Sequence, residues 1–158
     1  MNKPQLFVDD GVLRVEPPIK RQLLVQLDEG AYMPVREHAT DGGLDLKSPI
    51  DCCVQPGDSA AMDTRVHIQL PPNTTGEVVC KSGLNVNHGL ICSGLIDEGY
   101  SGSIVVKLYN LSNEPYYIKA GDKIAQLVIR PVLYLTPVQV DKIEGGERGN
   151  NGFGSTGR

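Results

Sequence analysis

The sequence has no run of about 18 consecutive apolar residues, the length that a membrane-spanning helix needs. Its first residues, MNKPQLFVDDG, include an acidic pair where a signal peptide would carry its apolar segment. It also lacks an excess of positive charge, because 19 Asp and Glu residues outnumber 15 Lys and Arg residues and leave a formal net charge of −4. We therefore expect a cytoplasmic protein with no membrane and no nucleic acid partner.

Cysteine and histidine are scarce and scattered. The four cysteines, Cys52, Cys53, Cys80 and Cys92, include no CxxC pair, and the chain has only three histidines. Zinc sites need closely spaced pairs of such ligands. We therefore interpret the cysteines as buried free thiols, with a structural zinc site as the less favoured alternative.

No long stretch repeats apolar residues at helical spacing, and turn-forming residues recur at short intervals instead. Between the turns lie short β-rich segments, namely RVHIQL (65–70), GSIVVKLYN (102–110) and KIAQLVI (123–129). At 158 residues the chain has the length of one ordinary domain. The pattern predicts an all-β fold of the sandwich or jelly-roll type.

The predicted strands differ in how their two faces should be buried. Val66, Ile68 and Leu70 alternate with polar residues, which is typical of a strand with one face in water. The apolar runs at 104–106 and 127–129 show no such alternation. We expect both of these runs to be buried on both faces.

We divide the chain into three parts. Residues 1–21 contain a Pro-Pro pair and form an N-terminal extension, which we expect to hold at most one strand. Residues 22–144 form the β-domain, in which SGLNVNHG (82–89) is the place for a single helical turn. Residues 145–158 form a glycine-rich tail that we expect to be flexible.

Two stretches place polar side chains in glycine-flanked turns. In GLIDEGYSG (94–102), Asp97 follows an apolar pair and Tyr100 comes three residues later. Taken alone, Asp97 is more simply explained as a turn cap, since Asp-X-Gly is common turn chemistry. In CKSGL (80–84), a cation, a hydroxyl and an open backbone N–H follow one another, which suits a phosphate group, although Ser-Gly is also a common loop.

The tail, RGNNGFGSTGR (148–158), adds further groups directed at anions. Arg148 and the hydroxyls of Ser155 and Thr156 suit phosphate oxygens, and Phe153 offers an apolar surface for a flat ring. The alternative is a terminus that simply stays solvated.

Together these stretches resemble the five motifs of the homotrimeric dUTPase family, in the family's order and from about residue 22 to the end. The matching stretches are DGGLDL (41–46), KSGL (81–84), GLIDEGYSG (94–102), GDKIAQLVI (121–129) and RGNNGFGSTG (148–157).

The resemblance implies a jelly-roll-like β-clip fold and a homotrimer whose C-terminal tails are exchanged between subunits. It implies hydrolysis of dUTP to dUMP and pyrophosphate, with Mg²⁺ bound to the triphosphate. In this likeness Asp97 orients and deprotonates the water that attacks the α-phosphate, and Arg148 reaches the terminal phosphate. The tail then acts as a lid, with Phe153 stacked on uracil.

The remaining site residues also come from the resemblance. Tyr100 lies against the deoxyribose and leaves no room for a 2′-hydroxyl, and Asp45 supports metal-bound waters without binding the metal directly. The implied substrate-binding residues are Lys81, Ser82, Gly83, Gly94, Leu95, Ile96, Tyr100, Gln126, Phe153, Gly154 and Ser155.

The sequence departs from the family's pattern at two places. Lys81 stands where many members have an arginine, so the planar bidentate contact is lost. The stretch HGLICSGLID lacks an asparagine that some members carry, and we therefore expect main-chain groups of residues 90–96 to read the base.

Two other functions compete with this interpretation. A dCTP deaminase or bifunctional enzyme of the same superfamily would need a glutamate at the position of Ser101, and serine cannot replace a carboxylate. A nucleotide-gated regulatory protein would use the same tail closure to signal to a partner. A catalytic protein that also binds a regulatory partner is a further alternative that the sequence leaves open.

Overall fold

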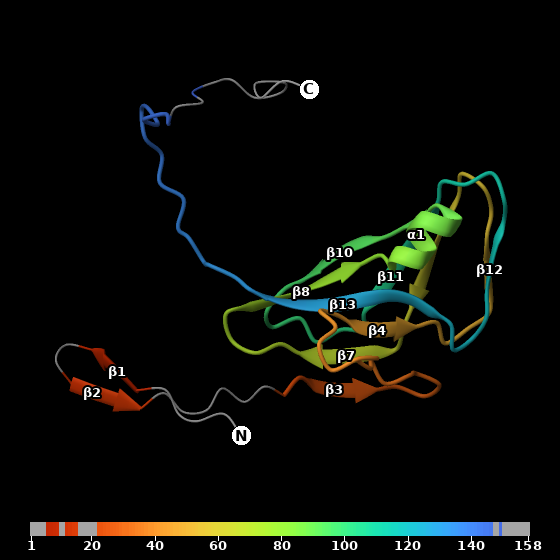
Figure 1. The fold of residues 1–158 in the computed structure, drawn as a ribbon, viewed down its shortest axis with the longest axis horizontal. Helices are drawn as coiled ribbons and strands as arrows, with labels where there is room; N and C mark the ends of the chain where they lie inside the picture. Colours follow the sequence, from red (N-terminus) through yellow and green to blue (C-terminus); the bar gives the residue numbers. More distant parts are fainter. Residues whose placement is uncertain (1–5, 10–11, 16–21, 147–148, 150–158) are drawn as a thin grey trace.

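A computed structural model describes residues 6–9, 12–15, 22–146 and 149, and it confirms the predicted all-β fold. The described residues form strands and one short helix, and the connections are short apart from residues 28–43 between β3 and β4 (Figure 1). The elements are β1 (Leu6–Asp9), β2 (Val12–Val15), β3 (Leu24–Leu27), β4 (Leu44–Lys47), β5 (Cys52–Val54), β6 (Ser59–Asp63), β7 (Val66–Gln69), β8 (Thr74–Val79), α1 (Ser82–His88), β9 (Leu90–Ile91), β10 (Ser93–Ile96), β11 (Val105–Asn110), β12 (Tyr116–Ile118) and β13 (Lys123–Pro131).

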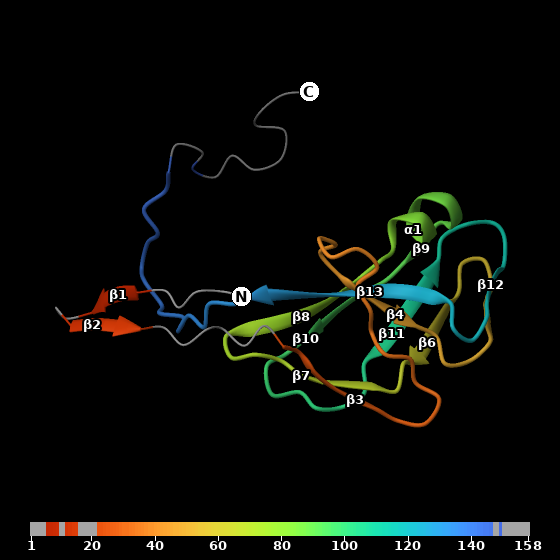
Figure 2. The same cartoon turned by 60° about the horizontal axis from the view of Figure 1, so that its bottom comes forward.

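Two antiparallel sheets carry most of the architecture. The first has the order β10-β8-β13-β4 and the second the order β6-β11-β9, with the pairs β12-β5 and β3-β7 beside them (Figure 2). The central strand β13 pairs Gln126 with Asp45 of β4 on one side and with Val79 of β8 on the other. Sheet register therefore brings together side chains from three separate stretches of the sequence.

One cluster of buried apolar side chains lies between the sheets. In β7, Val66 and Ile68 are buried and their polar neighbours are not, as the alternation predicts. The prediction that 104–106 is buried on both faces is wrong, because Val105 is 54% exposed between two buried neighbours. Residues 127–129 are only partly as expected, since Leu127 is buried and the next two are half-buried. An apolar run does not reveal that one face of a strand lies open.

The helix α1 is longer than the single turn predicted. Its seven residues make about two turns at 3.6 residues per turn, and it ends at Gly89, whose φ of 65° is the left-handed cap that glycine adopts easily. None of its residues is buried. No helix in the described ranges is long and apolar enough to cross a membrane.

The N-terminal extension holds two strands where we predicted at most one. β1 and β2 pair with each other in antiparallel register, from Leu6 opposite Val15 to Asp9 opposite Val12. They form a two-stranded sheet separate from the two main sheets.

Candidate active site

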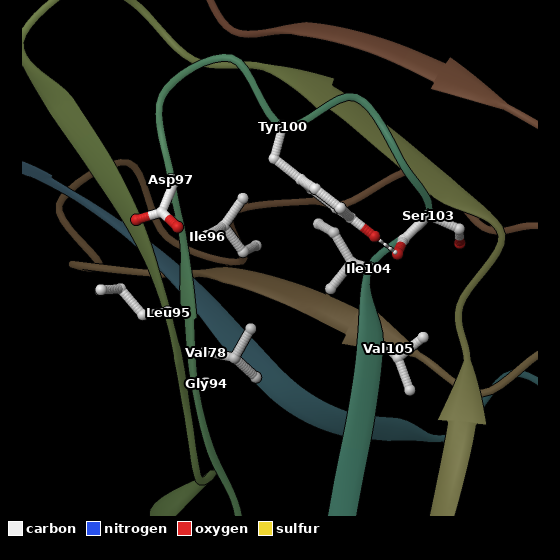
Figure 3. Close-up of a pocket in the computed structure, with 9 residues that line it drawn as sticks. All are labelled: Val78, Gly94, Leu95, Ile96, Asp97, Tyr100, Ser103, Ile104 and Val105. Carbon is white, nitrogen blue, oxygen red and sulfur yellow. Dashed lines mark hydrogen bonds between the residues drawn. The ribbon is translucent and has the colours of Figure 1, made fainter.

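A cavity of about 360 Å³ opens between β10, at the edge of the first sheet, and β11, the central strand of the second. The segment that joins these strands, residues 97–104, carries Asp97 and Tyr100 and so places polar side chains at the cavity. Figure 3 shows the lining residues, which are Val78, Gly94, Leu95, Ile96, Asp97, Tyr100, Ser103, Ile104 and Val105.

Asp97 stands at the end of β10, directly after the buried Ile96. The Tyr100 N–H donates to the main-chain oxygen of Asp97 at 3.1 Å, and Gly99 takes a φ of 89°, which closes the predicted turn with main-chain atoms. Among the described hydrogen bonds, none uses the carboxylate of Asp97 as a cap. That carboxylate is exposed at the cavity, which favours a functional role over turn capping.

Tyr100 is held on the other side of the cavity. Its hydroxyl donates to the main-chain oxygen of Ser103 at 3.0 Å, and Figure 3 shows the ring lying toward Ser103, with Ile96 between it and Asp97 and Ile104 beside the ring. A Cβ at Gly102 would lie 2.6 Å from Cζ of Tyr100, so only glycine leaves room for this ring position. The ring therefore forms a wall of the cavity, and its hydroxyl is tied to Ser103.

His67 anchors the segment that carries Tyr100, and sequence reasoning did not identify it. Its Nε2 lies 3.0 Å from Oδ2 of Asp28, and its Nδ1 lies 2.8 Å from the main-chain oxygen of Ser101. The hydrogen bond with Asp28, followed by that with Ser101, raises the pKa of His67. No motif marked this residue, because its partners are 39 and 34 positions away in the sequence.

A second polar group surrounds Asp45, whose side chain is only 4% exposed. Nζ of Lys81 lies 2.5 Å from Oδ1 of Asp45, and Nζ of Lys123 lies 2.8 Å from Oδ2. Nε2 of Gln126 lies 3.4 Å from Oδ1. Burial raises the pKa of Asp45, but the hydrogen bonds from Lys123, Lys81 and Gln126 outweigh it and lower the pKa overall.

Lys123 was also missed as a site residue, although it lies inside the stretch GDKIAQLVI. It bridges two carboxylates, since its Nζ also lies 2.7 Å from Oε2 of Glu37. Its hydrogen bonds with Asp45 and then Glu37 raise its pKa. The sequence signal that could have identified Lys123 was its position as a basic residue inside a recognised motif.

The predicted site residues thus fall into two groups on one sheet. Gly94, Leu95 and Ile96 lie on β10 at the cavity, with Asp97 and Tyr100 following. Lys81, Gln126 and Asp45 meet across β8, β13 and β4, and Ser82 and Gly83 begin α1 next to Lys81. The predictions for Arg148, Phe153, Gly154 and Ser155 lie outside the described residues.

Replacing Asp45 with Asn should destabilise the protein at neutral pH by about 1–3 kcal/mol, because two ammonium groups lose their anionic partner. A carboxyl whose pKa is lowered by folding stabilises the folded protein at pH values above its pKa in the unfolded state, about 3.9. That stabilisation is lost as the pH falls through its pKa in the folded state. The difference in unfolding free energy between Asp45→Asn and the wild type, measured with urea, should therefore have its full size at neutral pH and shrink below about pH 4.

Asp141→Asn is the control, because Asp141 is exposed and lies beyond the last strand. It should leave the unfolding free energy unchanged at every pH. An Asp45→Asn difference that stays constant down to pH 3 would contradict the assigned ion pairs.

With this geometry in place, comparison with known sequences gives a consistent result. A family model described as dUTPase matches residues 29–157. Deoxyuridine 5'-triphosphate nucleotidohydrolase of Clostridium kluyveri is 42% identical over 138 residues, which cover 85% of this chain and 96% of that protein. The enzyme of the same name from Mus musculus is 38% identical over 135 residues, covering 85% of this chain and 83% of that protein.

Solved structures agree. A variant of the Staphylococcus bacteriophage 80alpha dUTPase with dUpNHpp has a TM-score of 0.81 and 29% identity, covering 87% of this chain and 99% of that chain. The dUTPase of phage phi11 of S. aureus, described as coordinating a structural Mg(II) ion, has a TM-score of 0.73 and 29% identity, covering 78% of this chain and 99% of that chain.

Proposed function

Because the chain belongs to the dUTPase family, we propose that the cavity between β10 and β11 is where it hydrolyses dUTP to dUMP and pyrophosphate. One observation carries this assignment. The carboxylate of Asp97 and the ring of Tyr100 line the same cavity, which opens along the edge strand β10 (Figure 3). A nucleotide bound there has a general base, a flat wall and main-chain groups around it.

Asp97 supplies the base in this proposal. Among the described residues, no capping hydrogen bond uses the carboxylate of Asp97. It can therefore accept a hydrogen bond from water and aim that water at phosphorus. The water oxygen forms a bond to the α-phosphorus, its proton passes to Asp97, and the bond to the bridging oxygen breaks. Pyrophosphate leaves with the bonding electrons.

Tyr100 selects the sugar. Its hydroxyl donates to the main-chain oxygen of Ser103, which directs the ring along the cavity wall. A ring packed against C2′ in this orientation leaves no space for the hydroxyl of a ribonucleotide. Steric exclusion therefore favours deoxyribose.

The edge position of β10 supports base recognition by the main chain. Within the described residues, β10 has a strand neighbour on one side only, β8, so half of its N–H and C=O groups face away from the ladder. Uracil offers an acceptor, a donor and an acceptor along one edge. Main-chain groups of residues 90–96 can match that pattern, whereas cytosine would leave buried groups unpaired.

Phosphate binding falls to Lys81, Ser82, Gly83 and Gln126, with Arg148 reaching the terminal phosphate. The described residues contain no cluster of three or more His, Cys, Asp or Glu side chains that would cage a metal ion. Mg²⁺ commonly keeps several waters and takes its other ligands from phosphates, so a site built on the triphosphate needs no such cage. Oδ1 of Asp45 already faces Lys81 and Gln126, so a metal-bound water would be accepted by Oδ2, beside Lys123.

The oligomeric state and the boundaries of the domain and the lid also belong to the proposal. We assign residues 22–144 to the β-domain and residues 145–158 to a lid whose Phe153, Gly154 and Ser155 close over a site shared within a homotrimer. The cytoplasmic location and the absence of nucleic acid partners expected from the sequence stay predictions, as does a regulatory partner.

The activity is tested with a panel of dUTP, dCTP, dTTP and UTP in the presence of Mg²⁺, scored for pyrophosphate. Pyrophosphate from dUTP, and far less from the other three, is the expected result. Ammonia release from dCTP would instead indicate the deaminase function. If the unmutated protein binds dUTP without hydrolysing it, the result would indicate a purely regulatory protein.

Ser93→Ala should leave the preference for dUTP over dCTP nearly unchanged, because the main chain and not this side chain reads the base. An unpaired buried group costs about 1–3 kcal/mol, so the wild-type preference itself should be large. The measurement is the ratio of kcat/KM for the two nucleotides. A large fall in that ratio, with the fold intact, would show that a side chain reads the base.

A further inference from the structure

Two of the four cysteines lie side by side at the junction of the two groups of site residues. Cys80 follows β8 and Cys92 precedes β10, one residue beyond the registered pair of Val79 with Ser93. Their Sγ atoms are 3.4 Å apart. The next residue after Cys80 is Lys81, and β10 starts directly after Cys92, so the pair joins the phosphate-binding and base-binding segments.

The two thiols are already oriented toward each other. Sγ of Cys80 lies 3.2 Å from the main-chain oxygen of Cys92, and the Cys92 N–H donates to Sγ of Cys80. Cys92 is buried, whereas Cys80 is half-buried and so more accessible to a small reagent. Burial, together with the hydrogen bond to Cys80, raises the pKa of Cys92 to about 12. Cys80 is the more accessible of the two thiols, so a small oxidant reaches it first.

We propose that Cys80 and Cys92 form a reversible disulfide that controls dUTP binding at the adjacent site. The effect on binding rests on the proposed function, whereas the cross-link itself does not. The oxidant is a peroxide. The Cys80 thiol attacks hydrogen peroxide to give a sulfenic acid and one water, and Cys92 then attacks the oxidised sulfur, which forms the S–S bond and releases a second water. Two thiols are oxidised as one peroxide is reduced to two waters.

Closing the bond changes the geometry of the site. The sulfur atoms must approach from 3.4 Å to a bond length of about 2.05 Å, and directly opposed residues of an antiparallel pair have Cβ atoms about 4.5–5.5 Å apart, farther than a disulfide prefers. The strands are thus drawn together at Cys80 and Cys92. Because Lys81 and Gly94 lie within two residues of this bond, kcat/KM for dUTP should fall.

The other two cysteines provide an internal control. Cys52 and Cys53 are consecutive in β5, where side chains alternate between faces, and Sγ of Cys53 accepts a hydrogen bond from Gln55. They are not placed to bond to each other. A Cys52→Ser/Cys53→Ser double variant removes them while leaving the Cys80–Cys92 pair in place.

The experiment treats the full-length protein with hydrogen peroxide, alkylates the remaining thiols and maps the peptides by mass spectrometry. The expected product has lost two hydrogen atoms, carries a Cys80–Cys92 cross-link, and is restored by dithiothreitol. Its kcat/KM for dUTP should be at least about threefold lower than before treatment and should recover on reduction. The Cys52→Ser/Cys53→Ser protein should respond in the same way, and Cys80→Ser should form no cross-link.

Three results would overturn the proposal. Oxidation of Cys80 to sulfinic acid without a cross-link would show that Cys92 cannot reach it. A disulfide between chains would show that another thiol competes. A cross-link that leaves kcat/KM unchanged would refute control of the site. The peptide map reads the bond without using activity, so failure of the proposed function would appear separately, as absent dUTP hydrolysis in the reduced protein.

Discussion

Deleting residues 146–158 should lower turnover of dUTP by about 10³-fold or more, a magnitude taken from arginine contacts to phosphates in other phosphoryl-transfer enzymes. The deletion removes Arg148 and Phe153, which the proposal places on the terminal phosphate and on the uracil ring. Closing a lid also excludes water, which strengthens charge interactions with the phosphates. Steady-state kinetics of the truncated and full-length proteins measure the loss.

The truncated protein should stay folded. The buried core is built from residues between Leu46 and Leu127, and residues 133–146 are exposed and lead away from the sheets (Figure 1). The thermal midpoint should therefore change by only a few degrees. Unfolding on truncation would show that the tail is structural, and normal turnover would refute the lid.

Shared sites can be tested with the same truncated chain. If each site takes its lid from another subunit, mixing truncated chains with Asp97→Asn chains should restore activity, because some mixed trimers then contain one intact site. Sedimentation should give a mass near three times 17.1 kDa. No recovery in verified mixed trimers would mean that each chain builds its own site.

Asp97→Asn should lower kcat for dUTP by at least about 10²-fold, which is the usual contribution of a general base. Asparagine keeps the size of the side chain and the main-chain turn from Asp97 to Tyr100, so KM should change little. The measurement is kcat and KM at saturating Mg²⁺.

Glu98→Gln is the matched control, since it makes the same change of charge one residue along the turn. Glu98 accepts hydrogen bonds from the Asn73 N–H at 2.8 Å and the Tyr134 hydroxyl at 2.6 Å, and so its carboxylate is used to hold the turn. Both hydrogen bonds go to one oxygen, which the side-chain carbonyl of glutamine can replace, so kcat should remain within about a few-fold of the wild type. Equal losses in the two variants would indicate that local charge, and not a base at position 97, sustains turnover.

From the sequence came the fold class, the turn after Ile96 and the β10 side of the cavity, from Gly94 to Tyr100. These features are local: alternation over a few residues predicts a strand, and Asp-Glu-Gly at 97–99 predicts a turn wherever it occurs. The order of the five motifs pointed to the dUTPase family, to which the chain belongs.

Tertiary structure alone decided which side chains meet. Lys81 binds Asp45 across 36 positions of sequence, and Cys80 faces Cys92 across 12. It also left Val105 exposed within an apolar run. The physical reason is sheet register: a shift of one residue would turn every side chain of a strand to the other face, and the register that is adopted depends on burial of the whole core. No local pattern of residues contains that information.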